Sequence, residues 1–179
     1  MSLSMSSVTR CGRIGLRAVP RTIDLWVLRL LRTHGHSPPV EQTVLRFSRT
    51  GEHAGLWLAL ALLGAIVHPR RRRVYVGAVR AVVLTNLINI VAKRFVKRTR
   101  PFLEDLPALS PTLSSLSYPS AHASTSFAGA HSLSRVLPTV PLYATATAMA
   151  LSRPYLGVHY PSDVVAGAML GLGVARLVE

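Results

Sequence analysis

The stretch AGLWLALALLGAIV, residues 54–67, decides the fold class of this chain. All fourteen of its residues are apolar, and His68, Pro69 and four consecutive arginines at 70–73 follow it. A helix that crosses a bilayer needs about 20 apolar residues, so this one either uses its flanking residues to span or lies buried in a protein core. It is the clearest candidate for a membrane helix in the sequence.

Four later segments of similar composition predict further helices. They cover residues 74–91, 120–134, 136–152 and 164–178. Within the first of them we expect the polar Arg80, Asn86 and Asn89 to face the interior of the bundle, as polar residues in membrane spans usually do. In the last, Gly167, Gly171 and Gly173 predict close approach to a neighbouring helix. A soluble helical bundle is the alternative, but it would show polar outer faces that these segments lack.

A shorter apolar stretch near the N-terminus, residues 22–31, contains Trp26 and is flanked by arginines. Ten residues cannot cross about 30 Å of hydrocarbon. A helix here lies in the membrane interface or packs under the rest of the protein, and the sequence leaves both open. We therefore expect a mobile basic arm at 1–21, an interfacial helix and linker at 22–50, and a helical membrane domain at 51–179.

Charge and hydropathy together narrow the class of protein. There are 21 Lys and Arg residues against 7 Asp and Glu, a net charge of +14, yet the mean hydropathy is +0.34. A disordered basic tail would be polar. A nucleic-acid binder would place base-stacking aromatics among its cations, whereas aromatic residues make up only 6% here. The sequence predicts an all-α integral membrane bundle, with about five transmembrane helices plus an N-terminal interfacial helix, that binds no nucleic acid.

Three motifs carry residues suited to phosphate chemistry. KRFVKRTRP, residues 93–101, holds five cations within eight residues. YPSAH, residues 118–122, places His122 at a predicted helix start, where backbone N–H groups favour anions. SRPYLGVHYPSD, residues 152–163, places His159 four residues before Asp163, a spacing at which the carboxylate can orient the imidazole. Alone, each motif has an ordinary structural explanation, such as a basic cluster that anchors a helix at the membrane surface.

Helix connectivity brings the three motifs together. The second predicted span ends near residue 93, the third begins near 120, the fourth ends near 153 and the fifth begins near 161, so all four ends lie on one membrane face. Seven side chains are expected to meet there: Lys93, Arg100, Ser120, His122, Arg153, His159 and Asp163. Three cations, two histidines and one carboxylate are suited to phosphoryl transfer.

In order and spacing, the motifs KxxxxxxRP, PSxH and SRxxxxxHxxxD resemble those of the type 2 phosphatidic acid phosphatase (PAP2) superfamily, which includes lipid phosphatases and vanadium haloperoxidases. The resemblance implies the helical membrane core of that family over about residues 52–178. One position departs from the pattern, because Ala121 stands where the family usually has Gly. The backbone N–H remains there, but the freedom of Gly in φ is lost.

The resemblance also implies a role for each site residue. His159 is the nucleophile that forms a phosphohistidine, Asp163 holds its other nitrogen, and His122 protonates the leaving alkoxide. The phosphoryl oxygens are bound by Lys93, Arg100, Arg153, the Ser120 hydroxyl and the backbone of Ala121 and His122. We expect no metal and no cofactor, since a divalent ion would lie beside three cations with few carboxylates to hold it. The alternative without enzyme activity is a catalytically inactive membrane scaffold.

Arginine counts favour the cytoplasmic face of the cell (inner) membrane for the site. Eight arginines are predicted on its face, against six on the other. The eight are Arg10, Arg13, Arg17, Arg21, Arg29, Arg32, Arg46 and Arg49, and the six are Arg70 to Arg73, Arg135 and Arg176.

The resemblance implies that the partners are the bilayer and a membrane lipid or polyprenyl phosphate substrate. Among the substrates that the resemblance implies, the cytoplasmic face and the Arg/Ala/Val-rich composition favour decaprenylphosphoryl-5-phosphoribose, a cell-wall arabinan precursor, over polyprenyl diphosphate, phosphatidate or phosphatidylglycerophosphate. A homo-oligomer is left open.

Overall fold

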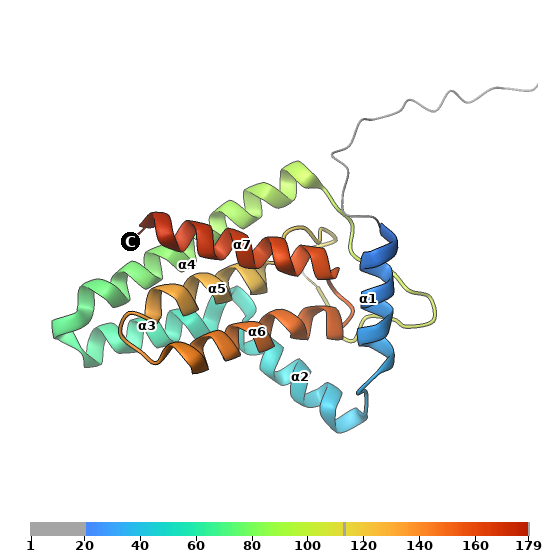
Figure 1. Cartoon of the computed structure of the whole chain (residues 1–179), viewed down its shortest axis with the longest axis horizontal. Coiled ribbons are helices and arrows are strands. Elements are labelled where there is room, and N and C mark those ends of the chain that lie inside the picture. Colours follow the sequence, from blue (N-terminus) through green and yellow to red (C-terminus); the bar gives the residue numbers. More distant parts are fainter. Residues whose placement is uncertain (1–20, 113, 179) are drawn as a thin grey trace, which may run out of the picture.

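The computed structural model describes residues 21–112 and 114–178, and their regular structure is helical (Figure 1). This described part contains the helices α1 Arg21–Thr33, α2 Pro38–Thr50, α3 Gly55–Val67, α4 Arg72–Val96, α5 Ala121–Leu133, α6 Thr139–Tyr155 and α7 Pro161–Val178. Short 3₁₀ turns, Glu52–Ala54 and Pro69–Arg71, precede α3 and α4. The all-α class is confirmed. The basic arm predicted at 1–21 lies outside the described residues except for Arg21, where α1 begins.

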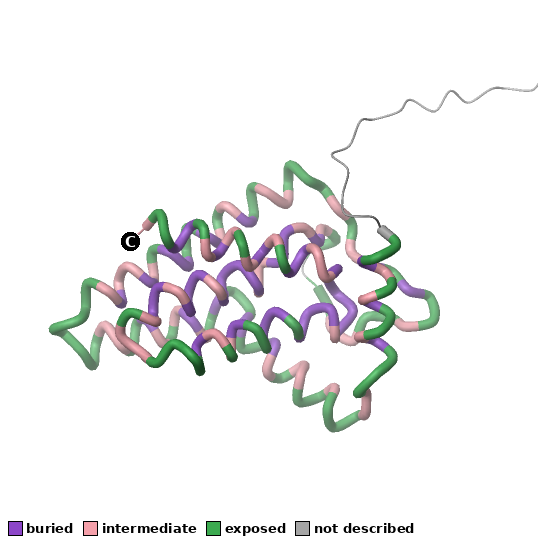
Figure 2. The backbone as a smooth tube through the Cα atoms, viewed as in Figure 1, coloured by how far each residue is buried: buried purple, intermediate pink, exposed green. Residues whose placement is uncertain are grey.

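Helix α5 forms the centre of the bundle, although it is rich in serine and threonine. Nine of its thirteen residues are buried, and α4, α6 and α7 pack around it (Figure 2). Several of its polar side chains find partners inside the protein. Thr125 donates to the Ala121 carbonyl at 2.9 Å, and the buried indole N–H of Trp57 donates to Ser126 Oγ at 2.8 Å. Because its neighbours cover it, this helix needs no apolar outer surface.

Two glycines let α7 lie close against α5. A Cβ on Gly171 would lie 2.1 Å from the carbonyl oxygen of Ser124, and one on Gly167 would lie 2.5 Å from that of Ser120. The expected close approach is confirmed at these two positions and wrong at Gly173, whose Cβ would face open space. The tight packing places the first turn of α7 beside the start of α5, where the Ser120 N–H donates to the carbonyl oxygen of Asp163 at 2.9 Å.

Replacing a closely packed glycine of α7 and an exposed glycine of α7 with alanine should change stability in opposite directions. Gly171→Ala pushes a methyl group into the α5 backbone and should lower the free energy of unfolding by about 1–3 kcal/mol. Gly173→Ala, the matched control two residues on, meets no atom and should raise that free energy by about 0.4–1 kcal/mol. Thermal denaturation in detergent compares the two variants. Equal melting temperatures would contradict the close α5–α7 contact.

The helices differ in their ability to cross a membrane. By length and composition two described segments qualify, Pro69–Val96 and Pro161–Val178. A third arises if α2 and α3, which meet at a bend of 52°, together form one span. Helix α5 is only about 20 Å long at 1.5 Å per residue, shorter than the roughly 30 Å of hydrocarbon. Two to three candidate spans are therefore shown, where the sequence predicted about five.

The three polar residues singled out within α4 differ in burial, and Asn86 is half-buried. Asn89 is buried, as expected, and donates to Ser124 Oγ at 3.1 Å and to the Pro119 carbonyl at 3.3 Å. Arg80 is exposed, so the expectation that it faces the interior is wrong. Arg80 lies near the start of α4, where a long side chain can extend toward the polar end of the bundle.

Helix α1 lies across the end of the bundle, beside α6 and α7 (Figure 1). Asp24 and Arg32 on one face are buried, and Arg32 donates to two backbone carbonyls, at 2.8 and 3.2 Å. On the other face, Ile23, Trp26 and Leu30 are exposed. Helix α1 therefore packs on the bundle with one face and leaves an apolar face exposed, so neither alternative for this segment is decided by its packing.

Candidate active site

The seven predicted site residues gather at one end of the bundle. There α4 and α6 end, α5 and α7 begin, and the connections 97–120 and 156–160 cross between them (Figure 1). Arg100 contacts His159, His159 faces Asp163, and Ser120 bonds to the backbone of Asp163. Lys93, Arg153 and His122 lie close enough to interact electrostatically with this group. The helix ends thus meet as hairpin connectivity predicts.

His159 lies in the connection before α7, with its two ring nitrogens in different surroundings. Nη1 of Arg100 lies 3.1 Å from Nε2, and Oδ2 of Asp163 lies 3.5 Å from Nδ1. A guanidinium can only donate, so Nε2 is an acceptor and carries no proton. The proton of the neutral ring is then on Nδ1, facing the carboxylate. This tautomer leaves the Nε2 lone pair pointing toward the cations, as a nucleophile would need.

The surroundings of His159 favour its neutral form. Its side chain is 3% exposed. Burial lowers the pKa of His159 well below the usual 6.5, and the charges of Arg100, Arg153 and Lys93 lower it further. The imidazole therefore remains an unprotonated base at pH 7.

We expect the imidazole of His159 to titrate below pH 6.5 in the substrate-free protein. Between its folded pKa and 6.5 the unfolded chain binds a proton that the folded chain does not, so acidification through this range also lowers stability. NMR of protein labelled at histidine Cε1 follows the titration, with the His159 signal assigned by its loss in His159→Gln. A midpoint at or above pH 6.5 would contradict the proposed electrostatics.

Asp163 is held by a residue that the sequence analysis left without a role, Arg98. Nη1 of Arg98 donates to Oδ1 of Asp163 at 2.8 Å, and Nη2 donates to Oδ2 of Asp24 at 2.6 Å. The guanidinium also lies 4.0 Å over the ring of Tyr160. Asp24 in turn accepts from the backbone N–H of Ser162 at 2.9 Å. A network from α1 therefore fixes the carboxylate that faces His159. The only signal in the sequence was a surplus cation within the first motif.

Ser48, near the end of α2, is a second residue that the sequence did not indicate. Its segment was predicted to be a linker, but it forms a helix whose last turn reaches the site. Ser48 Oγ accepts from Nη1 of Arg153 at 2.6 Å, and its carbonyl accepts from Nε2 of His122 at 3.2 Å. Ser152 Oγ donates to the same hydroxyl at 3.1 Å. Ser48 thus orients one of the three cations and one of the two histidines.

Backbone carbonyls hold the other two cations. Lys93 Nζ donates to the carbonyls of Pro119 and Ser117 at 2.8 and 3.1 Å, which joins the end of α4 to the segment before α5. Arg100 donates from Nη1 to the Val158 carbonyl at 2.6 Å. Carbonyl partners fix these side chains without neutralising them, so their charge remains for an anion.

Ser120 and Ala121 form the start of α5. Ser120 is the N-cap residue, and its hydroxyl accepts from the N–H of Ala123 at 3.5 Å. Ala121 is the first helical residue and is not among the described residues with positive φ. Alanine therefore suits this position, and the conformational freedom of the family's usual glycine is not required here. The helix begins beside the site, and the N–H groups at a helix start stabilise an anion.

The site has few candidate metal ligands. Across residues 21–112 and 114–178, no group of three His, Cys, Asp or Glu side chains is placed to hold an ion. The acidic group nearest His159, Asp163, is paired with Arg98. Positive side chains dominate the rest of the arrangement, which suits an anion.

Comparison with known proteins gives consistent matches. The profile of the PAP2 superfamily matches residues 74–178. Decaprenylphosphoryl-5-phosphoribose phosphatase of Mycobacterium tuberculosis is 43% identical over 145 residues, which cover 79% of this chain and 80% of the relative. The crystal structure of Aquifex aeolicus LpxE superposes with a TM-score of 0.74 at 26% identity, covering 87% of this chain and 94% of that one. A transmembrane PAP2 type phosphatidylglycerolphosphate phosphatase from Bacillus subtilis shares the fold, with a TM-score of 0.71 at 22% identity over 88% of this chain and 83% of that one. The chain belongs to the PAP2 superfamily and is a phosphatase of that type.

Proposed function

We propose that this protein removes phosphate from a lipid-linked substrate through a phosphohistidine on His159. Nε2 attacks phosphorus, the bond from phosphorus to the ester oxygen breaks, and His122 gives its proton to the leaving alkoxide. Water then gives a proton back to His122 as its oxygen attacks phosphorus, the P–N bond breaks, and inorganic phosphate leaves. The observation that carries this proposal is the 3.1 Å contact between Nη1 of Arg100 and Nε2 of His159, which puts a phosphate-binding cation beside the nucleophile.

The remaining site residues bind the phosphoryl group and stabilise it as charge develops. Lys93, Arg100 and Arg153 approach from α4, the following connection and α6, and they surround His159. The Ser120 hydroxyl and the backbone N–H groups of Ala121 and His122 add donors from the start of α5. Fixed donors around the transferred group lower the barrier of phosphoryl transfer in the way that metal ions do elsewhere. We therefore propose a reaction that needs no metal and that vanadate inhibits.

We propose decaprenylphosphoryl-5-phosphoribose as the substrate. The support is the 43% identity to a phosphatase named for that compound, over most of both chains. Leu103 and Leu106 pack against Leu25 and Leu28 of α1, and we propose that their segment, residues 101–119, builds the head-group pocket. Polyprenyl diphosphate, phosphatidate and phosphatidylglycerophosphate are the competing substrates to be tested.

We propose that the protein crosses the inner membrane several times, with its site at the cytoplasmic surface. Helices α3 to α7 form the membrane domain of residues 51–179, in which α5 and α6 are covered in part by their neighbours and so tolerate their short or polar sequences. Helix α1 lies at the interface beside the site, because its exposed Ile23, Trp26 and Leu30 suit the boundary between head groups and acyl chains. The arginine counts support the cytoplasmic orientation.

A substrate panel tests this function. Protein purified in detergent with EDTA is assayed for phosphate release from the prenyl-phosphoribose, a prenyl diphosphate, phosphatidate and phosphatidylglycerophosphate. We expect turnover in EDTA, inhibition by vanadate and the highest kcat/KM on the prenyl-phosphoribose. Complete loss of turnover in EDTA, restored by a divalent ion, would overturn metal independence. Activity on soluble phosphate esters alone would overturn the lipid substrate, and no release from any compound would favour an inactive scaffold.

A further inference from the structure

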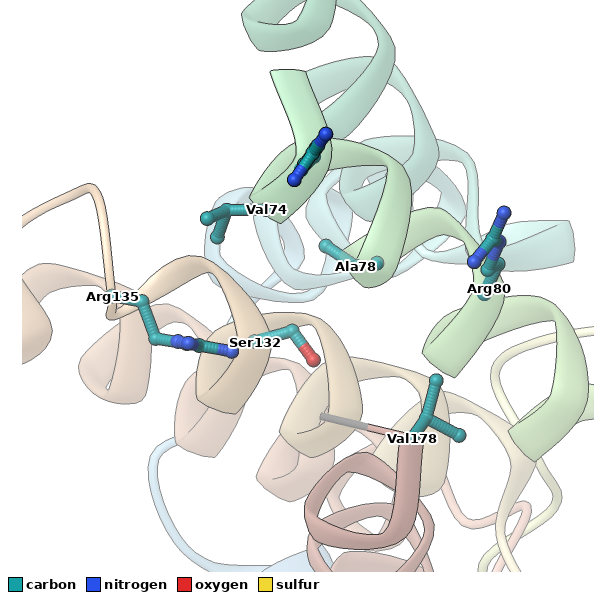
Figure 3. A pocket seen from close by; sticks show the side chains of 8 residues that line it. Val74, Ala78, Arg80, Ser132, Arg135 and Val178 are labelled. Atoms are coloured by element: carbon teal, nitrogen blue, oxygen red, sulfur yellow. The ribbon is translucent and has the colours of Figure 1, made fainter. Parts of the chain in front are cut away.

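A hollow of about 280 Å³ lies at the end of the bundle away from the active site (Figure 3). It opens between the start of α4, the end of α5 and the end of α7, and Arg73, Arg80 and Arg135 line it. Among the residues that the structure describes, no carboxylate lines the hollow or forms an ion pair with these three arginines. Three cations around one hollow, with no carboxylate among its described lining residues, would attract an anion.

Ser132 gives the hollow a polar group that lacks a partner. The residue is 3% exposed, and its Oγ is buried without a hydrogen bond. Figure 3 shows Ser132 between the side chains of Arg135 and Arg80, with Val178 of α7 below it. A buried hydroxyl that lacks a partner costs free energy, so a ligand oxygen that accepts from it would be favoured.

The position of the hollow along α4 indicates what kind of anion fits. Arg73 precedes the site residue Lys93 by 20 positions, or about 30 Å of helix, which matches the thickness of the hydrocarbon layer. Arg80 lies about 10 Å inside that end of the helix. An exposed arginine at this depth is costly in lipid unless it extends to the surface or meets an anion. Apolar Val74, Ala78 and Val178 complete the walls.

We propose that this hollow binds the phosphate group of an anionic phospholipid from the leaflet opposite the active site. Guanidinium groups form strong, charge-assisted hydrogen bonds with phosphate, and Ser132 donates one more. The hollow lies near the lower end of the range for small-molecule pockets, about 300–1,000 Å³. It therefore holds the head-group phosphate while the acyl chains lie in the bilayer against the apolar walls. The proposal rests on the proposed membrane orientation but not on the substrate.

Lipid retention measured by native mass spectrometry tests this site. The protein is held in nanodiscs of phosphatidylcholine in which about one lipid in four is phosphatidylglycerol. It is then released in the mass spectrometer, and the number of phosphatidylglycerol molecules bound to each protein is counted. We expect Arg80→Gln/Arg135→Gln to lower retention about tenfold or more, and Ser132→Ala, which changes no charge, to lower it several-fold. Phosphate release on the substrate panel should be unchanged in both variants, since the hollow lies far from His159.

The matched control removes two charges from the same end of the bundle without touching the hollow. Arg70→Gln/Arg71→Gln should retain phosphatidylglycerol as the unchanged protein does, because neither residue lines the hollow. Equal losses in the control and the Arg80/Arg135 variant would show diffuse attraction and overturn the site. In a separate arm, inorganic phosphate is added to lipid-free protein in detergent. Stabilisation by phosphate that is lost in Arg80→Gln/Arg135→Gln, together with no retention of phosphatidylglycerol, would assign the hollow to a free anion and overturn the lipid proposal.

Discussion

Replacing His159 with alanine should reduce phosphate release by about a thousandfold or more, as removal of a nucleophile does in other covalent hydrolases. The second site histidine, His122, donates from Nε2 to the Ser48 carbonyl, so this nitrogen carries a proton and has no lone pair for attack. The fold should survive, since the change removes a buried nitrogen, Nδ1, that has no full hydrogen bond. Release of inorganic phosphate in detergent, at saturating substrate, measures the effect.

A second measurement separates a nucleophile from a residue that only binds substrate. Brief reaction with a substrate carrying radioactive phosphate should label the unchanged protein with an acid-labile phosphohistidine, and His159→Ala should carry no label. The control is His68→Ala, an exposed histidine at the far end of α3, which should leave both turnover and labelling unchanged. Phosphate release that persists undiminished in His159→Ala would remove the covalent mechanism.

Much of the fold could be predicted because apolar segments and proline-containing turns are local signals. The segments at 54–67, 74–91, 120–134, 136–152 and 164–178 correspond to α3, α4, α5, α6 and α7. Alternating helices then bring the ends of α4, α5, α6 and α7 to one side without further information. The number of spans was harder to predict, because α5 is short and polar and lies among other helices instead of against lipid.

The parts of the site that the sequence missed all depend on contacts between distant segments. Asp24 reaches Arg98 across 74 positions, and Ser48 reaches Arg153 across 105. No spacing rule links such residues. Charge alone also gave a wrong prediction for Arg32. It was counted as a surface cation, but it is buried and donates to backbone carbonyls. The net charge of the chain therefore includes cations of the site, buried cations such as Arg32, and arginines on the surface.

Replacing Arg98 with glutamine should be the most destabilising single change near the site. The side chains of Asp24 and Asp163 are 3% and 0% exposed, and Arg98 is the cation that bonds to both. Without it, two buried carboxylates lose the cation that bonds to both, and breaking a buried ion pair in this way costs about 3–5 kcal/mol. Denaturant titration in mixed micelles measures the free energy of unfolding. Arg94→Gln, an exposed arginine of the same motif, is the control and should cause little change.

The same substitution tests whether Arg98 also positions the catalytic groups. Asp163 would lose the donor that fixes Oδ1, so its Oδ2 would no longer hold Nδ1 of His159 in place, and kcat should fall with little change in KM. Arg98 does not contact the phosphate-binding face of the imidazole, where Arg100 lies, so binding should persist. The double variant Asp24→Asn/Arg98→Gln removes one of the two stranded charges and should recover part of the stability but little of kcat. If kcat recovers together with stability in the double variant, Arg98 only supports the fold. If stability recovers and kcat does not, Arg98 holds Asp163 in place against His159.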